Sequence, residues 1–253
     1  MKGVATAASI VCVLSLASCT YLPTAFSPVT GVTETETRGA IVLAPSAGAP
    51  RSTGFLFYPG ALVDPHAYVP WLSQLAAAGI GVVLAKEPGN LAIFSIDAGL
   101  SLEGSIPGVS QWVISGHSLG GAMAAWSVYD HPDAYVGIVF LAAYPGTGQG
   151  LASWSHPVLS LSGSLDGLAT PEKVSAAMSL LPTPQVSVGS AAAITGAITG
   201  GARTVSYQIP GADHAQFASY GAQDGDNPAT ISVAAQQAEV VSSITTFFTV
   251  NGW

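Results

Sequence analysis

Charge is scarce in this chain. Only 8% of its 253 residues are charged, and six Lys and Arg stand against 14 Asp and Glu, which gives a net charge of −8. Such a surface repels the phosphate backbone of nucleic acids, and no cluster of basic residues offsets that repulsion. The composition therefore argues against a nucleic-acid partner. Because 49% of the residues are hydrophobic, it also argues against disorder, which requires low hydrophobicity and high charge.

Cysteine is equally scarce. Cys12 and Cys19 are the only two, and both lie in the N-terminal segment, so a domain that begins after them contains no disulfide. No group of His, Cys and Asp has the spacing of metal ligands, and the sequence has no phosphate-binding glycine loop or dinucleotide fingerprint. We expect neither a metal nor a cofactor. The length fits one domain with a sizeable core.

The first 18 residues are typical of a secretory signal peptide, with Lys2 followed by a short, almost wholly apolar run. This run ends in Leu16-Ala17-Ser18-Cys19, which resembles a bacterial lipobox. The resemblance implies cleavage before Cys19 and a lipid on its sulfur, and hence an exported protein of the bacterial cell envelope with a membrane anchor. A plain signal peptide cut near Ala17 and an uncleaved anchor are the alternatives. Residues 19–38, rich in Thr, Pro and Ser, are predicted to form a tether, and residues 39–253 the folded domain.

Short apolar runs then alternate with helical patterns. Predicted strands cover residues 40–43, 54–58, 80–85, 111–115, 135–143, 158–162 and 204–209, and predicted helices cover residues 65–79, 118–131, 171–181 and 231–248. This alternation predicts an α/β fold, in which helices cover both faces of a mostly parallel sheet. Residues 184–203, nearly all Ala, Gly, Ser, Thr and Val, are expected to be a flexible excursion, and their role stays open.

The strongest local pattern is Gly116-His117-Ser118-Leu119-Gly120. An apolar stretch precedes it and a run of small, helix-compatible residues follows it. This setting is typical of the G-x-S-x-G nucleophile elbow, a sharp strand-to-helix turn whose close neighbours must be glycine. The turn places the serine hydroxyl at a helix N-terminus, where the dipole favours developing negative charge. The pattern predicts that Ser118 is the nucleophile of a serine hydrolase, and a glycine-rich turn with an incidental serine is the alternative.

A serine hydroxyl needs a base that takes its proton. The chain has five histidines, His66, His117, His131, His156 and His214. His214 follows the last predicted strand, where the order Ser, acid, His expected of this fold places the base. His66, near the mouth of the site, is the reserve candidate. His117 is expected to point elsewhere from the elbow, and the other two histidines look structural.

The acid that orients this base should lie between the nucleophile and the base. Asp166 follows a predicted strand at its carboxyl end, where active sites of open α/β sheets gather, and it is predicted to hold the imidazole. A turn aspartate before glycine is the alternative. Asp130 and Asp133 flank a helix end, Glu172 is a further choice, and Asp213 is a rival whose position next to the base makes the geometry difficult.

An oxyanion hole needs two backbone N–H groups aimed at the tetrahedral oxygen. One is expected from Leu119, the residue after the nucleophile. The other is assigned to Ala61, in the loop Tyr58-Pro59-Gly60-Ala61 that follows an early predicted strand. Gly60 permits close approach of the backbone, although an ordinary Pro-Gly turn is a serious alternative for this loop.

Together these motifs resemble a bacterial subgroup of α/β hydrolases that is related to the dienelactone hydrolases. The resemblance is carried by residues 58–68, 116–121, 168–172 and 214–217, and it covers the chain from about residue 54 to 248. It implies a compact hydrolase without a large lid domain, with its triad on Ser118, Asp166 and His214. Dienelactone hydrolases proper use cysteine where Ser118 stands, so their lactone substrate does not follow.

Aromatic residues near the strand ends offer a pocket. Tyr68, Tyr144 and Phe217 are predicted to line it, with Trp154 and Tyr220 as further candidates, and core packing is the alternative for each. The predicted function is hydrolysis of a small carboxylic ester through an acyl-enzyme. A non-catalytic lipoprotein that binds a ligand or partner on the same fold, and an acyltransferase with the same triad, are the alternatives. The substrate and the oligomeric state stay open.

Overall fold

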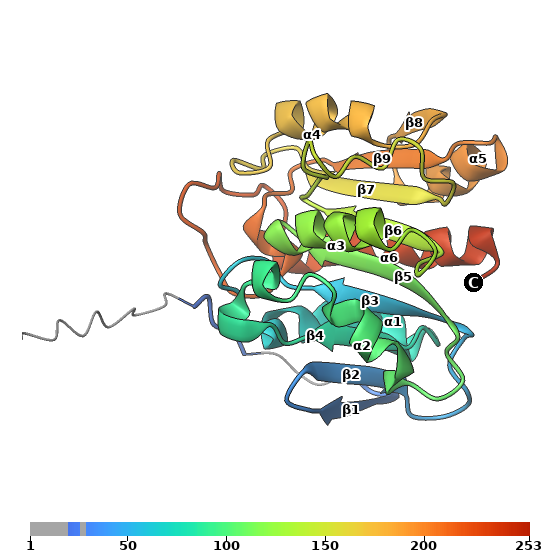
Figure 1. Cartoon of the computed structure of the whole chain (residues 1–253). Coiled ribbons are helices and arrows are strands. Elements are labelled where there is room, and N and C mark those ends of the chain that lie inside the picture. Colours follow the sequence, from blue (N-terminus) through green and yellow to red (C-terminus); the bar gives the residue numbers. More distant parts are fainter. Residues whose placement is uncertain (1–19, 26–28) are drawn as a thin grey trace, which may run out of the picture.

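The computed structural model describes residues 20–25 and 29–253. Nine strands form its central sheet: β1 (Val32–Glu36), β2 (Ala40–Pro45), β3 (Thr53–Tyr58), β4 (Val82–Ala85), β5 (Gln111–His117), β6 (Gly137–Leu141), β7 (Val158–Gly163), β8 (Gln185–Val188) and β9 (Thr204–Ile209). Their order is β1-β2-β4-β3-β5-β6-β7-β9-β8 (Figure 1). The two pairs that include β2 are antiparallel, and every other pair is parallel.

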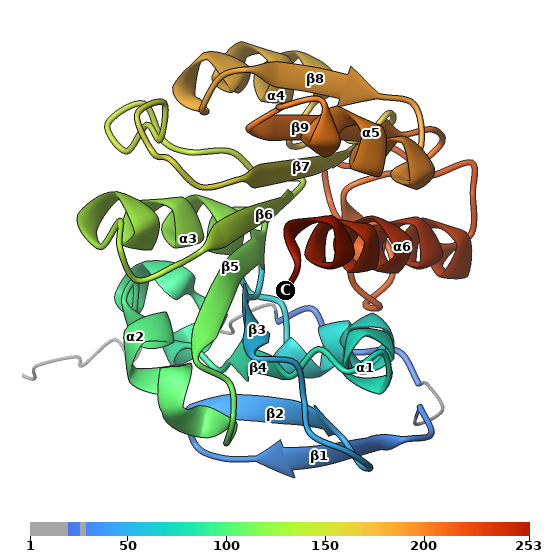
Figure 2. The same cartoon turned by 90° about the vertical axis from the view of Figure 1, so that its right-hand side faces the viewer.

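Six α-helices and several 3₁₀ turns connect the strands. The helices are α1 (Val69–Ala77), α2 (Ala98–Leu102), α3 (Leu119–Asp130), α4 (Pro171–Ala177), α5 (Ile194–Thr199) and α6 (Val233–Asn251). The 3₁₀ turns are η1 (Pro65–Tyr68), η2 (Pro88–Asn90), η3 (Ala92–Phe94), η4 (Glu103–Ser105), η5 (Met178–Leu180), η6 (Ala191–Ala193) and η7 (Ala215–Phe217). Helices α1 and α6 cover one face of the sheet, and α2 and α3 cover the other (Figure 2).

Each face of the sheet carries its own apolar core. On the side of α6, Ile244, Phe247 and Phe248 are fully buried. On the side of α3, Ala124 and Val128 are buried against the opposite strand face. Because both faces are covered, the central strands are largely apolar, and β3 and β6 have no exposed residue. The predicted mostly parallel sheet with helices on both faces is confirmed.

Residues 184–203 are ordered, so the prediction of a flexible excursion is wrong. They contain β8, which pairs in parallel with β9 at the edge of the sheet, and α5, which packs against α6. The strand was not evident in the sequence because β8 is an edge strand with two exposed residues and only one paired neighbour. Ala191 and Ile194, which are buried, attach the segment to the core.

The predicted tether also needs correction, because part of it belongs to the folded domain. β1 pairs with β2 from Val32↔Pro45 to Glu36↔Ile41, so the folded domain begins before residue 39. Tyr21 is bound as well, since its N–H donates to the Leu62 carbonyl (2.8 Å) and its carbonyl accepts from the Asp64 N–H (3.0 Å). The predicted signal peptide and Cys19 lie outside the described residues. In residues 20–25 and 29–253, no helix is long and apolar enough to cross a membrane.

Candidate active site

The elbow is built as a strand-to-helix turn between β5 and α3. Ser118 is the N-cap of α3 and has φ 52° and ψ −122°, a strained backbone conformation for a residue with a side chain. A Cβ at Gly120 would lie 2.2 Å from the Tyr58 carbonyl oxygen, and one at Gly116 would lie 2.4 Å from the Gly120 backbone. The turn therefore requires glycine at both positions, and its strain is held by the packing of β3 and β5 against the start of α3.

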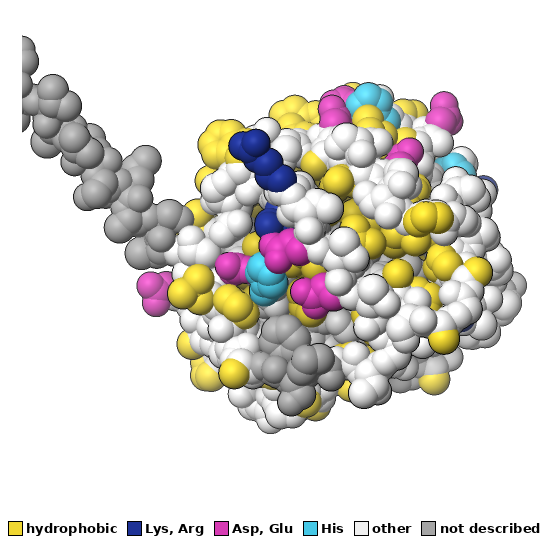
Figure 3. Space-filling model, turned by 90° about the horizontal axis from the view of Figure 1, so that it is seen from below, with side chains coloured by type: hydrophobic (Ala, Val, Ile, Leu, Met, Phe, Trp, Pro, Cys, Tyr) yellow, Lys and Arg dark blue, Asp and Glu magenta, His cyan; other side chains and the backbone are white. Residues whose placement is uncertain are grey.

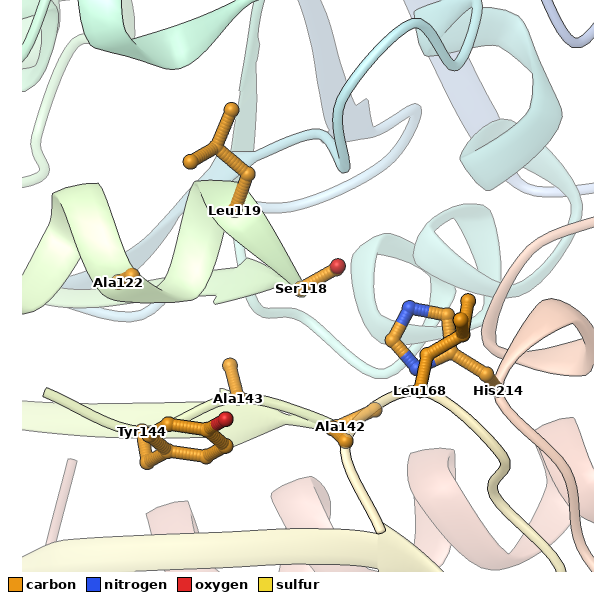
Figure 4. A pocket seen from close by; sticks show the side chains of 9 residues that line it. Ser118, Leu119, Ala122, Ala142, Ala143, Tyr144, Leu168 and His214 are labelled. Carbon is orange, nitrogen blue, oxygen red and sulfur yellow. The ribbon is translucent and has the colours of Figure 1, made fainter. Parts of the chain in front are cut away.

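Ser118 opens into a hollow of about 290 Å³ at the carboxyl ends of the strands. The lining residues are Ser118, Leu119, Ala122, Ala142, Ala143, Tyr144, Leu168, Ala169 and His214. Figure 4 shows the Ser118 hydroxyl directed toward the side of the hollow on which the His214 ring lies. The structure thus brings the predicted nucleophile and the predicted base, 96 positions apart in the sequence, to one cavity.

His214 is held by Asp166. Its Nδ1 lies 2.9 Å from Oδ2 of Asp166, and both side chains are almost completely buried. The other carboxylate oxygen of Asp166 accepts the N–H groups of Leu168 (2.8 Å) and Ala169 (2.7 Å), which fixes the carboxylate plane. The Nε2 atom of His214 has no hydrogen-bond partner among the described residues. In the neutral ring with Nδ1 as the donor to Asp166, Nε2 is the nitrogen that can accept a proton.

Asp226, a residue that the sequence analysis did not single out, connects the loops of the acid and the base. Its Oδ1 accepts the Gly167 N–H, and its Oδ2 accepts the N–H groups of His214 and Ala215, all at 2.9 Å. Because these three amides belong to two loops, the carboxylate fixes the relative position of the loops, and its Oδ1 also accepts the N–H of the adjacent Asn227 (2.9 Å). No sequence motif marks this role, because the three amides come from two distant segments.

His117 does not line the hollow, but it packs against His214, a contact that the sequence did not reveal. Its ring centroid lies 4.5 Å from that of His214, and its Nδ1 lies 2.9 Å from the Tyr68 hydroxyl. His117 is 1% exposed. Burial is the main reason that its pKa lies well below the ordinary histidine value; the charge of His214 lowers this pKa further, and the His214 backbone acts weakly in the opposite direction.

Tyr68 and Phe217 do not line the hollow, so two of the three predicted pocket aromatics are corrected. Tyr68 is fully buried, and its hydroxyl accepts the Gly60 N–H at 2.8 Å. Phe217 is 1% exposed and packs behind His117, with ring centroids 5.7 Å apart. Tyr144 does line the hollow. Tyr68 and Phe217 lie one layer of side chains below the cavity surface. Sequence position does not reveal whether a residue lines a cavity or packs behind its lining.

The loop after β3 lies against the first turn of α3, as the close approach of the Tyr58 carbonyl to Gly120 shows. The Ala61 N–H has no hydrogen-bond partner among the described residues, whereas the N–H of the following residue, Leu62, donates to Asn90 (2.7 Å). Leu119, as the first residue of α3, has no carbonyl within the helix to which its N–H can donate. Leu119 lines the hollow and Ala61 does not.

The rival titratable residues are engaged elsewhere. His66 pairs with Asp64 (2.8 Å) and Glu36 (3.4 Å), outside the residues that line the hollow. Figure 3 shows a histidine among acidic and basic side chains on one face of the molecule, much of whose remaining surface is uncharged. The Asp213 carboxylate accepts the N–H groups of Gln216 and Ala229 instead of bonding to His214.

The other candidates also lie away from the cavity. Asp130, Asp133 and Glu172 are exposed and do not line it. Trp154 lines a separate hollow beside His156, and the hydroxyl of Tyr220 donates to Gln223 (2.6 Å). In the part of the chain that the structure describes, no three His, Cys, Asp or Glu side chains gather in a way that could hold a metal ion.

Comparisons with known proteins agree with this architecture. A family model described as "Alpha/beta hydrolase family" matches residues 54–238. Similar solved structures include Est1E from Butyrivibrio proteoclasticus (11% identity, 85% of this chain and 98% of the other, TM-score 0.55) and a dienelactone hydrolase from Anabaena variabilis (14%, 85% and 98%, 0.55). A bacterial membrane phospholipase A also resembles it (12%, 88% and 88%, 0.57). At these identities the likeness concerns the fold alone. A search of curated proteins found no match.

Proposed function

Because this chain belongs to the α/β hydrolase family, we propose that it is a serine hydrolase that cleaves carboxylic esters with Ser118, His214 and Asp166. One observation carries the proposal: an imidazole held on a buried carboxylate at 2.9 Å lines the same hollow as a serine on a strained elbow. If Ser118 were only an incidental residue of a glycine-rich turn, there would be no reason for an oriented imidazole with an unpartnered nitrogen in the same hollow.

In this reaction the Ser118 hydroxyl attacks the ester carbonyl while Nε2 of His214 takes its proton. The imidazolium that forms donates through Nδ1 to Asp166, whose negative charge stabilises it. The imidazolium then protonates the departing alcohol, which leaves an acyl group on Ser118. Water, deprotonated by the same nitrogen, attacks this acyl-enzyme, and the acid is released as Ser118 regains its proton.

We assign the N–H groups of Leu119 and Ala61 as the donors to the oxyanion of the tetrahedral intermediate. Leu119 is at the start of α3, where N–H groups without intrahelical partners and the helix dipole both favour negative charge. Support for Ala61 comes from its unpartnered N–H and from the contact between its loop and Gly120.

The shape of the hollow favours a small acyl group next to Ser118. Ala122, Ala142 and Ala143 contribute to its lining. Tyr144 lines both this hollow and a second one of about 350 Å³ beside α4, so we place Tyr144 at the division between them. The second hollow is lined mainly by apolar atoms, so it suits a hydrocarbon part of the substrate. We assign Tyr144 to substrate binding at this division.

The direct test is labelling with a fluorophosphonate probe, which phosphonylates an activated serine. We expect the wild type to be labelled and Ser118→Ala to lose the label. Ser175→Ala, an exposed serine on α4, serves as the matched control and should retain it. A folded wild-type protein that resists the probe and turns over no p-nitrophenyl ester would favour the alternative of a non-catalytic binding protein.

Turnover that disappears in His214→Ala would in turn exclude a binding role. Transfer of the acyl group to an added alcohol, measured against release of the free acid, distinguishes an acyltransferase from a hydrolase, since both use the same residues.

For location, we propose an exported lipoprotein that is anchored to a bacterial membrane through Cys19. Intact-mass analysis should find a diacylglycerol on Cys19, and a mature terminus elsewhere would contradict the proposal. Because Tyr21 is bound to the loop that contains Leu62, the anchor would be attached close to the folded domain rather than at the end of a long tether.

A further inference from the structure

A buried hydrogen-bonded chain lies directly below the two groups that the proposed function assigns to proton transfer and oxyanion binding. It runs from the Gly60 N–H to the Tyr68 hydroxyl (2.8 Å) and on to Nδ1 of His117 (2.9 Å). Tyr68 is 0% exposed and His117 is 1% exposed. Neither residue lines the catalytic hollow, so neither contacts the reacting atoms.

The hydrogen-bond inventory determines where the protons lie in this chain. Gly60 can only donate through its N–H, so the Tyr68 oxygen is the acceptor in that bond. The described residues offer the Tyr68 hydroxyl proton no acceptor other than Nδ1 of His117, so we assign Nδ1 as the acceptor in this bond. With Nδ1 as the acceptor, His117 is the neutral ring that carries its proton on Nε2, an atom for which the described residues include no side-chain partner.

A neutral ring at this place matters because His117 lies against the proposed base. The ring centroids of His117 and His214 are 4.5 Å apart. When His214 takes the serine proton it becomes cationic, and a second imidazolium at this distance would oppose that step. The groups that face His117 are Tyr68, His214 and Phe217, and none of them is a carboxylate that would favour its protonation.

The same hydroxyl fixes the loop that precedes Ala61. A Cβ at Gly60 would lie 2.8 Å from Nδ1 of His117 and 3.1 Å from the Tyr68 oxygen, so this residue packs directly on both partners. Tyr68 is itself held rigidly, since its ring packs on Phe57 with centroids 4.8 Å apart. Because Gly60 is held in this way, the N–H of the adjacent Ala61 is held in one direction as well.

We propose that Tyr68 and His117 are positioning residues, which hold the oxyanion loop through Gly60 and keep a neutral imidazole beneath His214. The proposal rests on the proposed serine-hydrolase function. It assigns a role to the second residue of the elbow, and it explains why a tyrosine hydroxyl is buried beside the active site.

The kinetic test uses Tyr68→Phe, which removes the hydroxyl and keeps the ring. We expect kcat for p-nitrophenyl acetate to fall about 10- to 100-fold, because a displaced oxyanion donor is costly, while KM changes less than about threefold. Tyr135→Phe is the matched control, since this buried tyrosine also bonds through its hydroxyl, to Ser127 at 3.0 Å, and lies away from the hollow. Tyr135→Phe should keep the wild-type kcat, and a Tyr68→Phe variant that also keeps it would overturn the proposal.

A second pair of variants tests His117. His117→Asn retains an oxygen that can accept from Tyr68, and it should keep kcat within about fivefold of wild type, whereas His117→Leu should lose as much as Tyr68→Phe. The Tyr68→Phe/His117→Leu double variant should be no slower than either single variant, as expected for residues that act as one unit. Independent, additive losses would contradict the coupling.

Nuclear magnetic resonance of wild-type protein with ¹⁵N-labelled histidine gives a readout that does not depend on the variants folding. The His117 signals should show the Nε2–H tautomer without titration between about pH 5 and 8. A His117 that carries its proton on Nδ1, or that titrates in this range, would overturn the proposal. The proposed function fails separately, if the wild type is not labelled at Ser118.

Discussion

Glu87 should make the protein less stable as the pH rises. This residue follows β4, is only 6% exposed, and has no hydrogen-bond partner for either carboxylate oxygen among the described residues. Burial raises its pKa from 4.5 to about 8. The folded state therefore keeps the proton over a pH range in which the unfolded chain has released it.

The sign and size of the effect follow from proton linkage. Below about pH 4.5 both states are protonated, and Glu87 makes no pH-dependent contribution. Between there and pH 8 the unfolded state binds fewer protons, so the free energy of unfolding decreases by about 1.4 kcal/mol per pH unit. The loss reaches about 3 kcal/mol at pH 7 and about 5 kcal/mol above pH 8, as an order of magnitude.

Urea unfolding of wild type and Glu87→Gln, followed by tryptophan fluorescence, measures this contribution. The variant should be within about 1 kcal/mol of wild type at pH 5 and more stable by a few kcal/mol at pH 8. Glu34→Gln, on the exposed face of β1, is the control and should follow the wild-type pH dependence. If Glu87→Gln follows it too, the carboxyl group is not held neutral by burial and the reasoning is refuted.

Three further predictions concern the site. Asp166→Asn should lower kcat for p-nitrophenyl acetate about 10³- to 10⁴-fold, since the imidazole loses its charged partner, and a loss below tenfold would contradict the pairing. Gly120→Ala should destabilise the fold by about 3 kcal/mol or more in thermal unfolding, because its Cβ would meet the Tyr58 carbonyl. Gly196→Ala, whose Cβ meets no atom within 4 Å, should instead stabilise α5 by about 0.5–1 kcal/mol. Tyr144→Ala should join the two hollows and raise kcat/KM for longer-chain esters relative to acetate, by about fourfold per added methylene, and an unchanged chain-length profile would contradict the division assigned to Tyr144.

The sequence predicted those parts of the site that depend on local backbone geometry and chain order. The elbow is local, because the glycines around Ser118 are required by atoms of the same turn and of the neighbouring strand. Asp166 and His214 follow β7 and β9, which are adjacent and parallel. Two residues that follow the carboxyl ends of adjacent parallel strands are brought together by the sheet itself, so strand order was sufficient to predict their proximity.

The parts that were missed depend on long-range contacts or on depth. Asp226 looks like any acidic loop residue in the sequence, because its partners are backbone amides, which every residue has. Tyr68 and Phe217 were misplaced because one layer of packing separates a residue that lines a cavity from one that supports it. β1, with the sequence VTETE, is mostly exposed and lies at the sheet edge, so it lacks the apolar run that revealed the inner strands.

The loops of the site are held by one another rather than by the sheet alone. Asp226 joins the loop after β7 to the loop after β9, Tyr68 joins the loop after β3 to the end of β5, and the Asn90 carbonyl joins the same β3 loop to the turn after β4. Each connection includes at least one backbone N–H donor, from Gly167 and His214, from Gly60, and from Leu62. Ser118, Asp166 and His214 follow three different strands, β5, β7 and β9, so their relative positions depend on how these loops are connected. A change that breaks one connection should therefore reduce catalysis before it reduces global stability, because the apolar cores on the two faces of the sheet remain intact.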